Sequence, residues 1–152
     1  MKKIGIDAIS YYVPSLYLSI EKLSEHRNLD FQKLNKGLGL EKMAIADSNE
    51  DPSSFAANAL IKLFEENNID PKEIGRIYMG TESALDASKP SATYATDLVE
   101  KYFSKKFGER CLKNCDIADL TFACIGGVDA LQNTIDWVSV NPGKKAIVVS
   151  SD

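Results

Sequence analysis

Stretches with strand-like and helix-like patterns of apolar side chains alternate along the 152 residues of the chain. Residues 3–13, KIGIDAISYYV, alternate apolar and polar positions and are rich in β-formers, so they predict a first strand that ends at Pro14. Shorter apolar runs predict further strands at residues 76–80, 115–124 and 144–152. The last of these, KKAIVVSSD, is apolar on both faces, and we therefore expect it to be buried in the middle of a sheet.

Helical spacing is clearest in residues 51–68, DPSSFAANALIKLFEENN, where Pro52 suits the first turn. The apolar positions that recur at this spacing are Phe55, Ala59, Leu60, Leu63 and Phe64. Further helices are expected at residues 19–28, with Ser19 as the N-cap, and at 91–107 and 126–140. Residues 29–47 are punctuated by glycine and predict a loop or short helix that leads to an irregular strand.

The alternation of strands and helices predicts an α/β layered fold, with a mainly parallel central sheet and helices on both faces. A chain of this length forms one domain of ordinary size. It stops at Asp152, directly after a strand that we expect in the middle of a sheet, and this indicates that the domain is truncated after Asp152.

The charge and composition of the chain argue against nucleic-acid binding and membrane association. The net charge of −4 argues against a nucleic-acid partner, which would call for a basic face, and lysines and acidic residues alternate along the chain. No apolar run approaches the roughly 20 residues that span a bilayer, so we expect no membrane association. The N-terminus lacks the pattern of a signal peptide, which makes the cytoplasm the expected location.

The three cysteines form neither a disulfide framework nor a metal site in this interpretation. Cys111 and Cys115 lie four residues apart, but His26 is the only histidine and is far from them in sequence. Zinc in structural sites takes about four protein ligands. We therefore expect no metal and no redox cofactor.

Two reactive side chains follow predicted strands. In an open α/β sheet, ligands bind beyond the carboxyl ends of the strands, where Glu82 and Cys124 are expected. A helix N-terminus beside Cys124 would favour the thiolate and lower the pKa of the thiol. Gly126 and Gly127 would let a substrate approach the backbone, whose N–H groups could receive an oxyanion. Cys124 as a buried packing residue and Glu82 as a surface carboxylate are the structural alternatives.

Three segments together resemble one enzyme family. GTESALDASK, residues 80–89, resembles the G-T-E-[ST]-x-x-D-x-S-K segment of 3-hydroxy-3-methylglutaryl-CoA (HMG-CoA) synthases, and FACIGGVDAL, residues 122–131, resembles their A-C-x-G-[GA] nucleophile segment. A third piece, Leu29-Asp30, Lys33 and Gly37-Leu38-Gly39, resembles their entry loop. The three pieces occur in family order. The related ketoacyl synthase III enzymes share the nucleophile position but lack the glutamate.

The resemblance implies a thiolase-like fold, with residues 1–152 forming most of its first half. Cys124 would form an acetyl-thioester with acetyl-CoA, and Glu82 would act as general acid/base in the addition to acetoacetyl-CoA. Asp30 and Phe31 would lie near the mouth of the CoA site. The remaining residues that the motifs place in the substrate-binding set are Ser83, Ser88, Lys89, Gly126 and Gly127. A surface contact with a carboxylate explains Lys89 equally well.

The same resemblance implies CoA thioesters as partners, an acyl carrier protein as an alternative carrier, and a homodimer. Ile125 stands where the family often has tyrosine, which leaves the mevalonate pathway and polyketide β-branching both open. The family's catalytic histidine belongs to the second half, so residues 1–152 alone are expected to be inactive. His26 is interpreted as a surface histidine.

Two alternatives stay open at this stage. A ketoacyl synthase III or thiolase relative would use Cys124 without a base at Glu82. A non-catalytic scaffold or interaction domain would keep the fold and lack the chemistry.

Overall fold

The computed structural model describes residues 4–152, which form two units. Residues 13–50 form one, here called the hairpin unit. Residues 51–152, together with residues 4–12, form the other, here called the sheet unit.

The hairpin unit is built on two short antiparallel strands, β1 (Leu16–Ser19) and β2 (Lys42–Ile45). Between them lie helix α1 (Ile20–Arg27) and a single π-helical turn (Lys33–Gly37). Ser19 caps α1 by accepting a hydrogen bond from the backbone N–H of Lys22 at 3.4 Å. The helix predicted at residues 19–28 is therefore confirmed, as is the short helix that leads to a strand within residues 29–47.

The sheet unit carries the parallel sheet and the long helices. Its elements are α2 (Pro52–Glu66), a 3₁₀ turn (Pro71–Glu73), β3 (Ile74–Gly80), α3 (Ser91–Phe107), β4 (Asp116–Leu120), α4 (Gly126–Val140) and β5 (Lys145–Ser150). Within the described residues the strand order is β4-β3-β5, and both neighbours run parallel to β3. The predicted α/β fold with a parallel sheet is confirmed.

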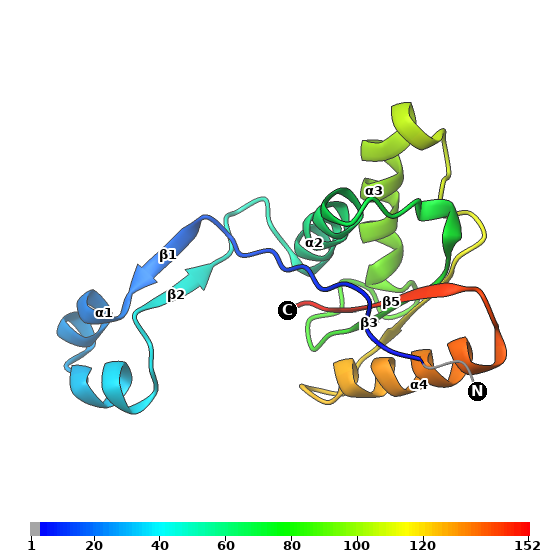
Figure 1. Ribbon diagram of the computed structural model, residues 1–152. Coiled ribbons are helices and arrows are strands. Elements are labelled where there is room, and N and C mark those ends of the chain that lie inside the picture. The colour runs from blue at the N-terminus through cyan, green and yellow to red at the C-terminus, as the bar shows by residue number, and fades with distance from the viewer. Residues whose placement is uncertain (1–3) are drawn as a thin grey trace. The chain divides into compact units, whose positions relative to one another are not determined.

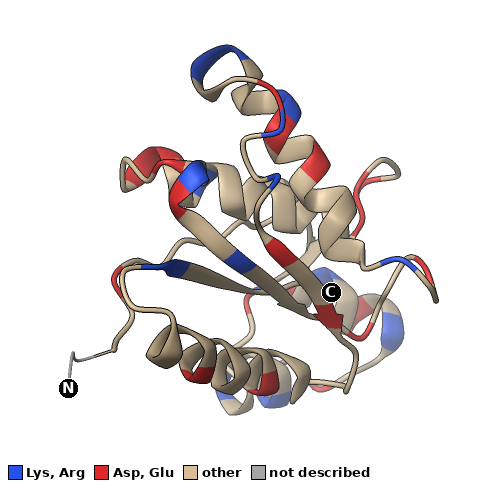
Figure 2. Ribbon diagram, turned by 90° about the vertical axis from the view of Figure 1, so that its right-hand side faces the viewer, with Lys and Arg blue, Asp and Glu red and all other residues tan. Residues whose placement is uncertain are grey.

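The sheet unit is layered, with α2 and α3 on one face of the sheet and α4 on the other (Figure 1). The core between the sheet and the α2–α3 pair is built mainly from Leu60, Phe64, Ile77, Met79, Val99, Phe103, Ile147 and Val149. Asp51 caps α2, because its carboxylate accepts from the N–H of Ser54 at 2.7 Å while the Ser54 hydroxyl accepts from the N–H of Asp51. Acidic and basic residues both occur on α2 and α3, whereas the charged residues of α4 are acidic (Figure 2).

The first predicted strand is wrong. Residues 4–13 are in no strand, residue 3 lies outside the described part, and the chain first pairs only after Pro14, in β1. A strand needs a neighbouring strand to pair with, and none of the strands in the described part of the chain pairs with this segment. Its apolar side chains are correspondingly open, with Ile6, Ile9 and Tyr11 between 69% and 78% exposed.

The predicted central position of the last strand is also wrong for the described sheet, whose middle strand is β3 and whose edge is β5. The apolar pattern of β5 has another cause. Ile147 and Val149 belong to the buried core, and residues 144–151 also line an apolar cavity of about 520 Å³ together with residues 4–12 and parts of α2 and α4. Within residues 4–152, no helix is both long and apolar enough to cross a membrane.

Candidate active site

The thiol of Cys124 and the carboxylate of Glu82 meet at the carboxyl edge of the sheet. Cys124 Sγ donates a hydrogen bond to Glu82 Oε1 over 3.0 Å. Glu82 follows β3, and Cys124 lies between β4 and α4. Because β3 and β4 are parallel neighbours, their carboxyl ends deliver both side chains to the same edge.

A tight turn presents Cys124 to solvent. The strand predicted to run to residue 124 ends at Leu120, and the chain reverses over residues 122–125. Phe122 O accepts from the N–H groups of Ile125 and Gly126 at 3.2 and 3.1 Å, and Ala123 has a φ of 43°, in the left-handed region. A strand must leave the sheet before a helix can start, which is why the pairing stops short of the cysteine. The packing alternative for Cys124 does not fit, because the residue is exposed.

Glycines let α4 approach β3 at this edge. A Cβ on Gly80 would lie 2.5 Å from the Cα of Gly127 and 2.6 Å from the carbonyl carbon of Gly126, closer than real Cβ contacts allow. A Cβ on Gly126 would overlap the carbonyl oxygen of Leu120. The visible role of Gly126 and Gly127 is therefore to hold the first turn of α4 against the ends of the strands. The expectation that they bind substrate stays a prediction.

The pKa of Cys124 is raised, whereas the sequence led us to expect a lowered pKa. The hydrogen bond to Glu82 and the negative charge of that carboxylate are the main causes, and Asp152 adds a smaller contribution. An adjacent carboxylate favours the neutral thiol and outweighs the N-terminus of α4. In the hydrogen bond of this pair, the sulfur is the donor.

Asp152 fixes the segment that carries Glu82. Its Oδ1 accepts from Thr81 Oγ1 at 3.0 Å, from the N–H of Ser83 at 3.2 Å and from the N–H of Glu82. The sequence interpretation missed this residue. It follows β5, so the rule that pointed to Glu82 and Cys124 applies to it as well.

We expect Asp152→Ala in the complete protein to slow turnover by about 10- to 100-fold, because the backbone of Glu82 loses its anchor and small misplacements of catalytic groups are costly. Asp152→Asn keeps one acceptor oxygen and should lose less. Steady-state assays of both variants would be compared with Asp97→Ala, which removes an exposed aspartate paired with Lys101 on α3. A normal rate in Asp152→Ala would show that the anchor is dispensable.

The other motif residues after β3 organise their own loop. The N–H of Ser83 also donates to Thr81 Oγ1 at 3.0 Å. The N–H groups of Ser88 and Lys89 donate to Asp86 Oδ1 at 2.7 and 3.1 Å. The Lys89 ammonium lies 3.9 Å from the centre of the Tyr94 ring, and the hydroxyl of that tyrosine donates to Asp86. These contacts shape the loop and leave the predicted substrate contacts untested.

Asp30 and Phe31 belong to the hairpin unit. Asp30 Oδ1 accepts from the N–H groups of Gln32 and Lys33 at 2.9 and 3.3 Å, just before the π-helical turn. Phe31 is half-buried and lines a shallow pocket with Leu29 and parts of α1. His26 is exposed in the last turn of α1. The predicted role of Asp30 and Phe31 at a CoA mouth remains a prediction.

The other two cysteines lie in different surroundings. Cys111 is buried, and burial raises the pKa of its thiol. Burial also raises the pKa of Cys115 to about 12, with help from the charge of Asp116. Among residues 4–152, no group of three or more His, Cys, Asp and Glu side chains is placed to hold a metal ion.

Comparisons with known proteins agree on one family. The family model described as "Hydroxymethylglutaryl-coenzyme A synthase N terminal" matches residues 1–152. A hydroxymethylglutaryl-CoA synthase of Schizosaccharomyces pombe is 39% identical over 153 residues, which cover 99% of this chain and 32% of that protein. One from Haloferax volcanii is 33% identical and covers 100% of this chain and 34% of that protein.

A solved structure described as "MvaS in complex with 3-hydroxy-3-methylglutaryl coenzyme A" superposes with a TM-score of 0.83 at 34% identity, covering 96% of this chain and 33% of that one. The HMG synthase of the curacin biosynthetic pathway, in complex with an acetyl donor-ACP, superposes with a TM-score of 0.76 at 28% identity, covering 96% of this chain and 34% of that one. The chain therefore spans about a third of the length of the relatives that it matches.

Proposed function

The chain belongs to the hydroxymethylglutaryl-CoA synthase family, and from this premise we propose that the complete protein condenses acetyl-CoA with acetoacetyl-CoA, or with a β-ketoacyl thioester on a carrier protein. The product is a 3-hydroxy-3-methylglutaryl thioester. The observation that carries the proposal is the 3.0 Å contact between the Cys124 thiol and the Glu82 carboxylate.

In the first step, Cys124 Sγ attacks the carbonyl carbon of acetyl-CoA while its proton passes to Glu82 along the existing hydrogen bond. The new bond joins Sγ to the acetyl group, and the bond between that group and the CoA sulfur breaks. The departing CoA thiolate takes the proton from Glu82. Cys124 is then acetylated, and the carboxylate of Glu82 is free again.

In the second step, Glu82 removes a proton from the methyl group of the acetyl-cysteine, and the resulting carbanion adds to the ketone carbon of the acceptor. The new bond is a carbon–carbon bond, and the acceptor oxygen takes a proton to become a hydroxyl, which balances the proton that Glu82 removed from the methyl group. Water then hydrolyses the bond to Cys124, which releases a free carboxylate and restores the thiol. The two steps use the Glu82 carboxylate twice, which is consistent with its position beside the sulfur of Cys124.

The proposal includes its partners. Of the solved relatives, one binds 3-hydroxy-3-methylglutaryl-CoA and another binds an acetyl donor-ACP, so we propose CoA thioesters as substrates and keep a carrier protein as the alternative. Thioester exchange and carbanion addition require no metal or redox cofactor. We also propose a cytoplasmic homodimer. Inactivity of residues 1–152 on their own fits a chain that spans a third of its relatives.

The contact with Glu82 separates this proposal from a ketoacyl synthase III or thiolase activity, which would use the cysteine without that base. A scaffold role would require neither side chain. Acetyl transfer to Cys124 followed by condensation that depends on Glu82 supports the synthase, whereas acetyl transfer with normal condensation after loss of Glu82 supports the other enzyme class.

Cys124 is expected to be the only cysteine that acetyl-CoA labels in the described part of the complete protein. It is exposed beside a proton acceptor, whereas Cys111 is buried and the pKa of Cys115 is raised to about 12. Peptide mass spectrometry after incubation with acetyl-CoA would locate the label. Cys124→Ala should abolish the labelling and Cys111→Ala should preserve it. Label on Cys111 or Cys115 with Cys124 unmodified would contradict the assignment.

A further inference from the structure

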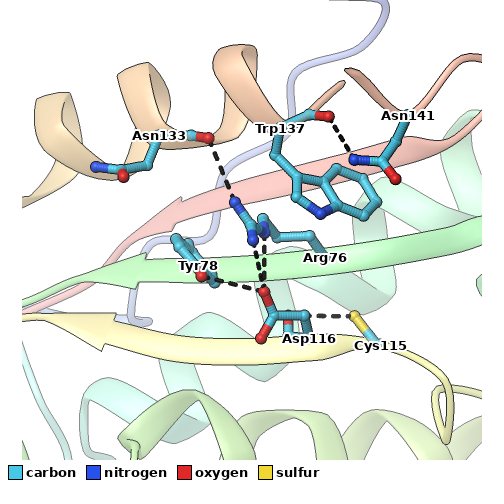
Figure 3. Close-up of polar contacts among 7 residues, drawn as sticks. All are labelled: Arg76, Tyr78, Cys115, Asp116, Asn133, Trp137 and Asn141. Atoms are coloured by element: carbon cyan, nitrogen blue, oxygen red, sulfur yellow. Dashed lines mark hydrogen bonds and ion pairs between the residues drawn. The ribbon is translucent and has the colours of Figure 1, made fainter. Parts of the chain in front are cut away.

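A second polar cluster lies on the face of the sheet that α4 covers, at the end of β3 opposite to Glu82. It is centred on Arg76 of β3, whose side chain is only 14% exposed (Figure 3). The cluster joins three elements, because its other members come from β3, β4 and α4. We call it the Arg76 cluster; its members are Arg76, Tyr78, Asp116, Asn133 and Trp137.

Arg76 makes contacts in several directions at once. Its Nε and Nη2 donate to Asp116 Oδ2 on β4 at 3.0 and 2.7 Å. Its Nη1 donates to the backbone carbonyl oxygen of Asn133 on α4 at 3.3 Å. The guanidinium carbon lies 4.2 Å from the centre of the Tyr78 ring and 4.9 Å from that of the Trp137 ring. A planar cation with several donors suits such a site better than lysine does.

Helix α4 thus packs closely against the central strand β3 at two points along the helix. At the catalytic end the contact is backbone to backbone, between Gly80 and the Gly126-Gly127 pair. At the other end a Cβ on Gly75 would lie 2.6 Å from the Trp137 ring, so the indole packs directly onto the strand beside Arg76. Cys124 closely precedes this helix and Glu82 closely follows this strand.

We propose that Arg76 is a positioning residue, which fixes how far α4 lies along β3 and thereby sets the contact between Cys124 and Glu82. Its hydrogen bond to the Asn133 carbonyl resists sliding of the helix, and its pairing with Asp116 ties the same point to β4. A packed interface moves between discrete arrangements rather than continuously, so loss of this attachment displaces the whole helix. The expected loss of condensation rests on the proposed function. The expected change in the contact between Cys124 and Glu82 does not depend on that function.

The test uses the complete protein and two variants. Arg76→Met keeps an unbranched stem and removes the guanidinium, and Arg76→Lys keeps a charge near Asp116. We expect condensation to fall by about 10- to 100-fold in Arg76→Met, with partial recovery in Arg76→Lys. The decisive measurement is the pH dependence of iodoacetamide alkylation at Cys124, followed by peptide mass spectrometry. In Arg76→Met the alkylation profile should move to lower pH, because Glu82 no longer lies against the thiol.

A double variant separates positioning from general loosening. In a Glu82→Gln background the carboxylate is already gone, so adding Arg76→Met should leave the alkylation profile where Glu82→Gln alone places it. Lys145→Met is the matched control, since it breaks an exposed 2.7 Å ion pair with Glu73 elsewhere on the sheet. It should change neither the profile nor the rate.

Two results would overturn the inference. If Arg76→Met lowers the melting temperature and the rate but leaves the alkylation profile unchanged, Arg76 only stabilises the fold. If Arg76→Met shifts the alkylation profile equally in the wild-type and Glu82→Gln backgrounds, the shift does not come from the position of α4 relative to β3. Should Arg76→Met fail to fold, Arg76→Lys and Asp116→Asn decide by the same readout. If the wild-type protein transfers no acetyl group, the proposed function is refuted. If Arg76→Met still shifts the alkylation profile in that case, the positioning role of Arg76 stands.

Discussion

Glu82→Gln in the complete protein is expected to leave Cys124 open to acetylation and to slow condensation by about 10²- to 10⁴-fold, the usual contribution of a general acid/base. The amide cannot take a proton from the methyl group, so the second step fails. The amide cannot accept the thiol proton in the first step either, but acetylation survives, because the carboxylate is also what raises the pKa of Cys124 and its loss lets the sulfur react as a thiolate that is already formed. Without its negative charge, that pKa falls and more thiolate forms at neutral pH.

Two assays on the same sample would check this expectation. Mass spectrometry reports the acetyl group on Cys124, and the amount of 3-hydroxy-3-methylglutaryl-CoA formed in the presence of acetoacetyl-CoA reports condensation. Glu109→Gln, at an exposed glutamate between α3 and β4, is the control and should behave like the wild type. Normal condensation in Glu82→Gln would make Glu82 a structural residue and remove the main support for the synthase proposal.

Gly80→Ala should destabilise the complete protein by about 3 kcal/mol, at the upper end of the cost of overpacking a core. The new methyl group would lie 2.5 Å from the Cα of Gly127, and neither backbone can rotate away as a side chain can. Relief requires α4 to move off the sheet, which carries Cys124 away from Glu82. We therefore expect activity to be lost together with stability, as measured by chemical unfolding and by the condensation assay.

Two other glycines calibrate that result. A Cβ on Gly127 would meet only the side chain of Ser150, whose hydroxyl can rotate, so Gly127→Ala should cost less. A Cβ on Gly5 would have no neighbour within 4 Å, so Gly5→Ala should be nearly neutral. Equal effects at Gly80 and Gly5 would show that the helix does not rest on the strand as described.

The local pattern of apolar residues predicted the helix bounds well, but it predicted poorly which strands pair with one another. The helices α3 and α4 begin and end where the sequence indicated, because helical periodicity is a property of residues that lie close together along the chain. The pairing of β5 with β3 depends on residues about 70 positions apart. An apolar run cannot report such a partner, so the position of β5 at the sheet edge and the absence of a strand over residues 4–13 were not predictable.

The site was predictable where one rule sufficed. Strand ends in a parallel sheet share an edge, and this rule places Glu82 and Cys124 together from the order of residues alone. The same rule applied to β5 would have found Asp152. The direction of the pKa shift at Cys124 was wrong because the helix N-terminus was considered without the neighbouring carboxylate. The contact of Arg76 with Trp137 joins residues 61 positions apart and left no local signal.

The hydrogen bond from Cys124 to Glu82 also bears on the oxidation of the Cys124 sulfur. Peroxides react with thiolates far faster than with thiols, and an exposed nucleophilic cysteine is normally vulnerable to them. Cys124 is exposed, but the adjacent carboxylate raises the pKa of its thiol and so lowers the share of thiolate. The hydrogen bond to Glu82 is therefore expected to slow sulfenic acid formation at Cys124, by raising the pKa of the thiol rather than by burying it.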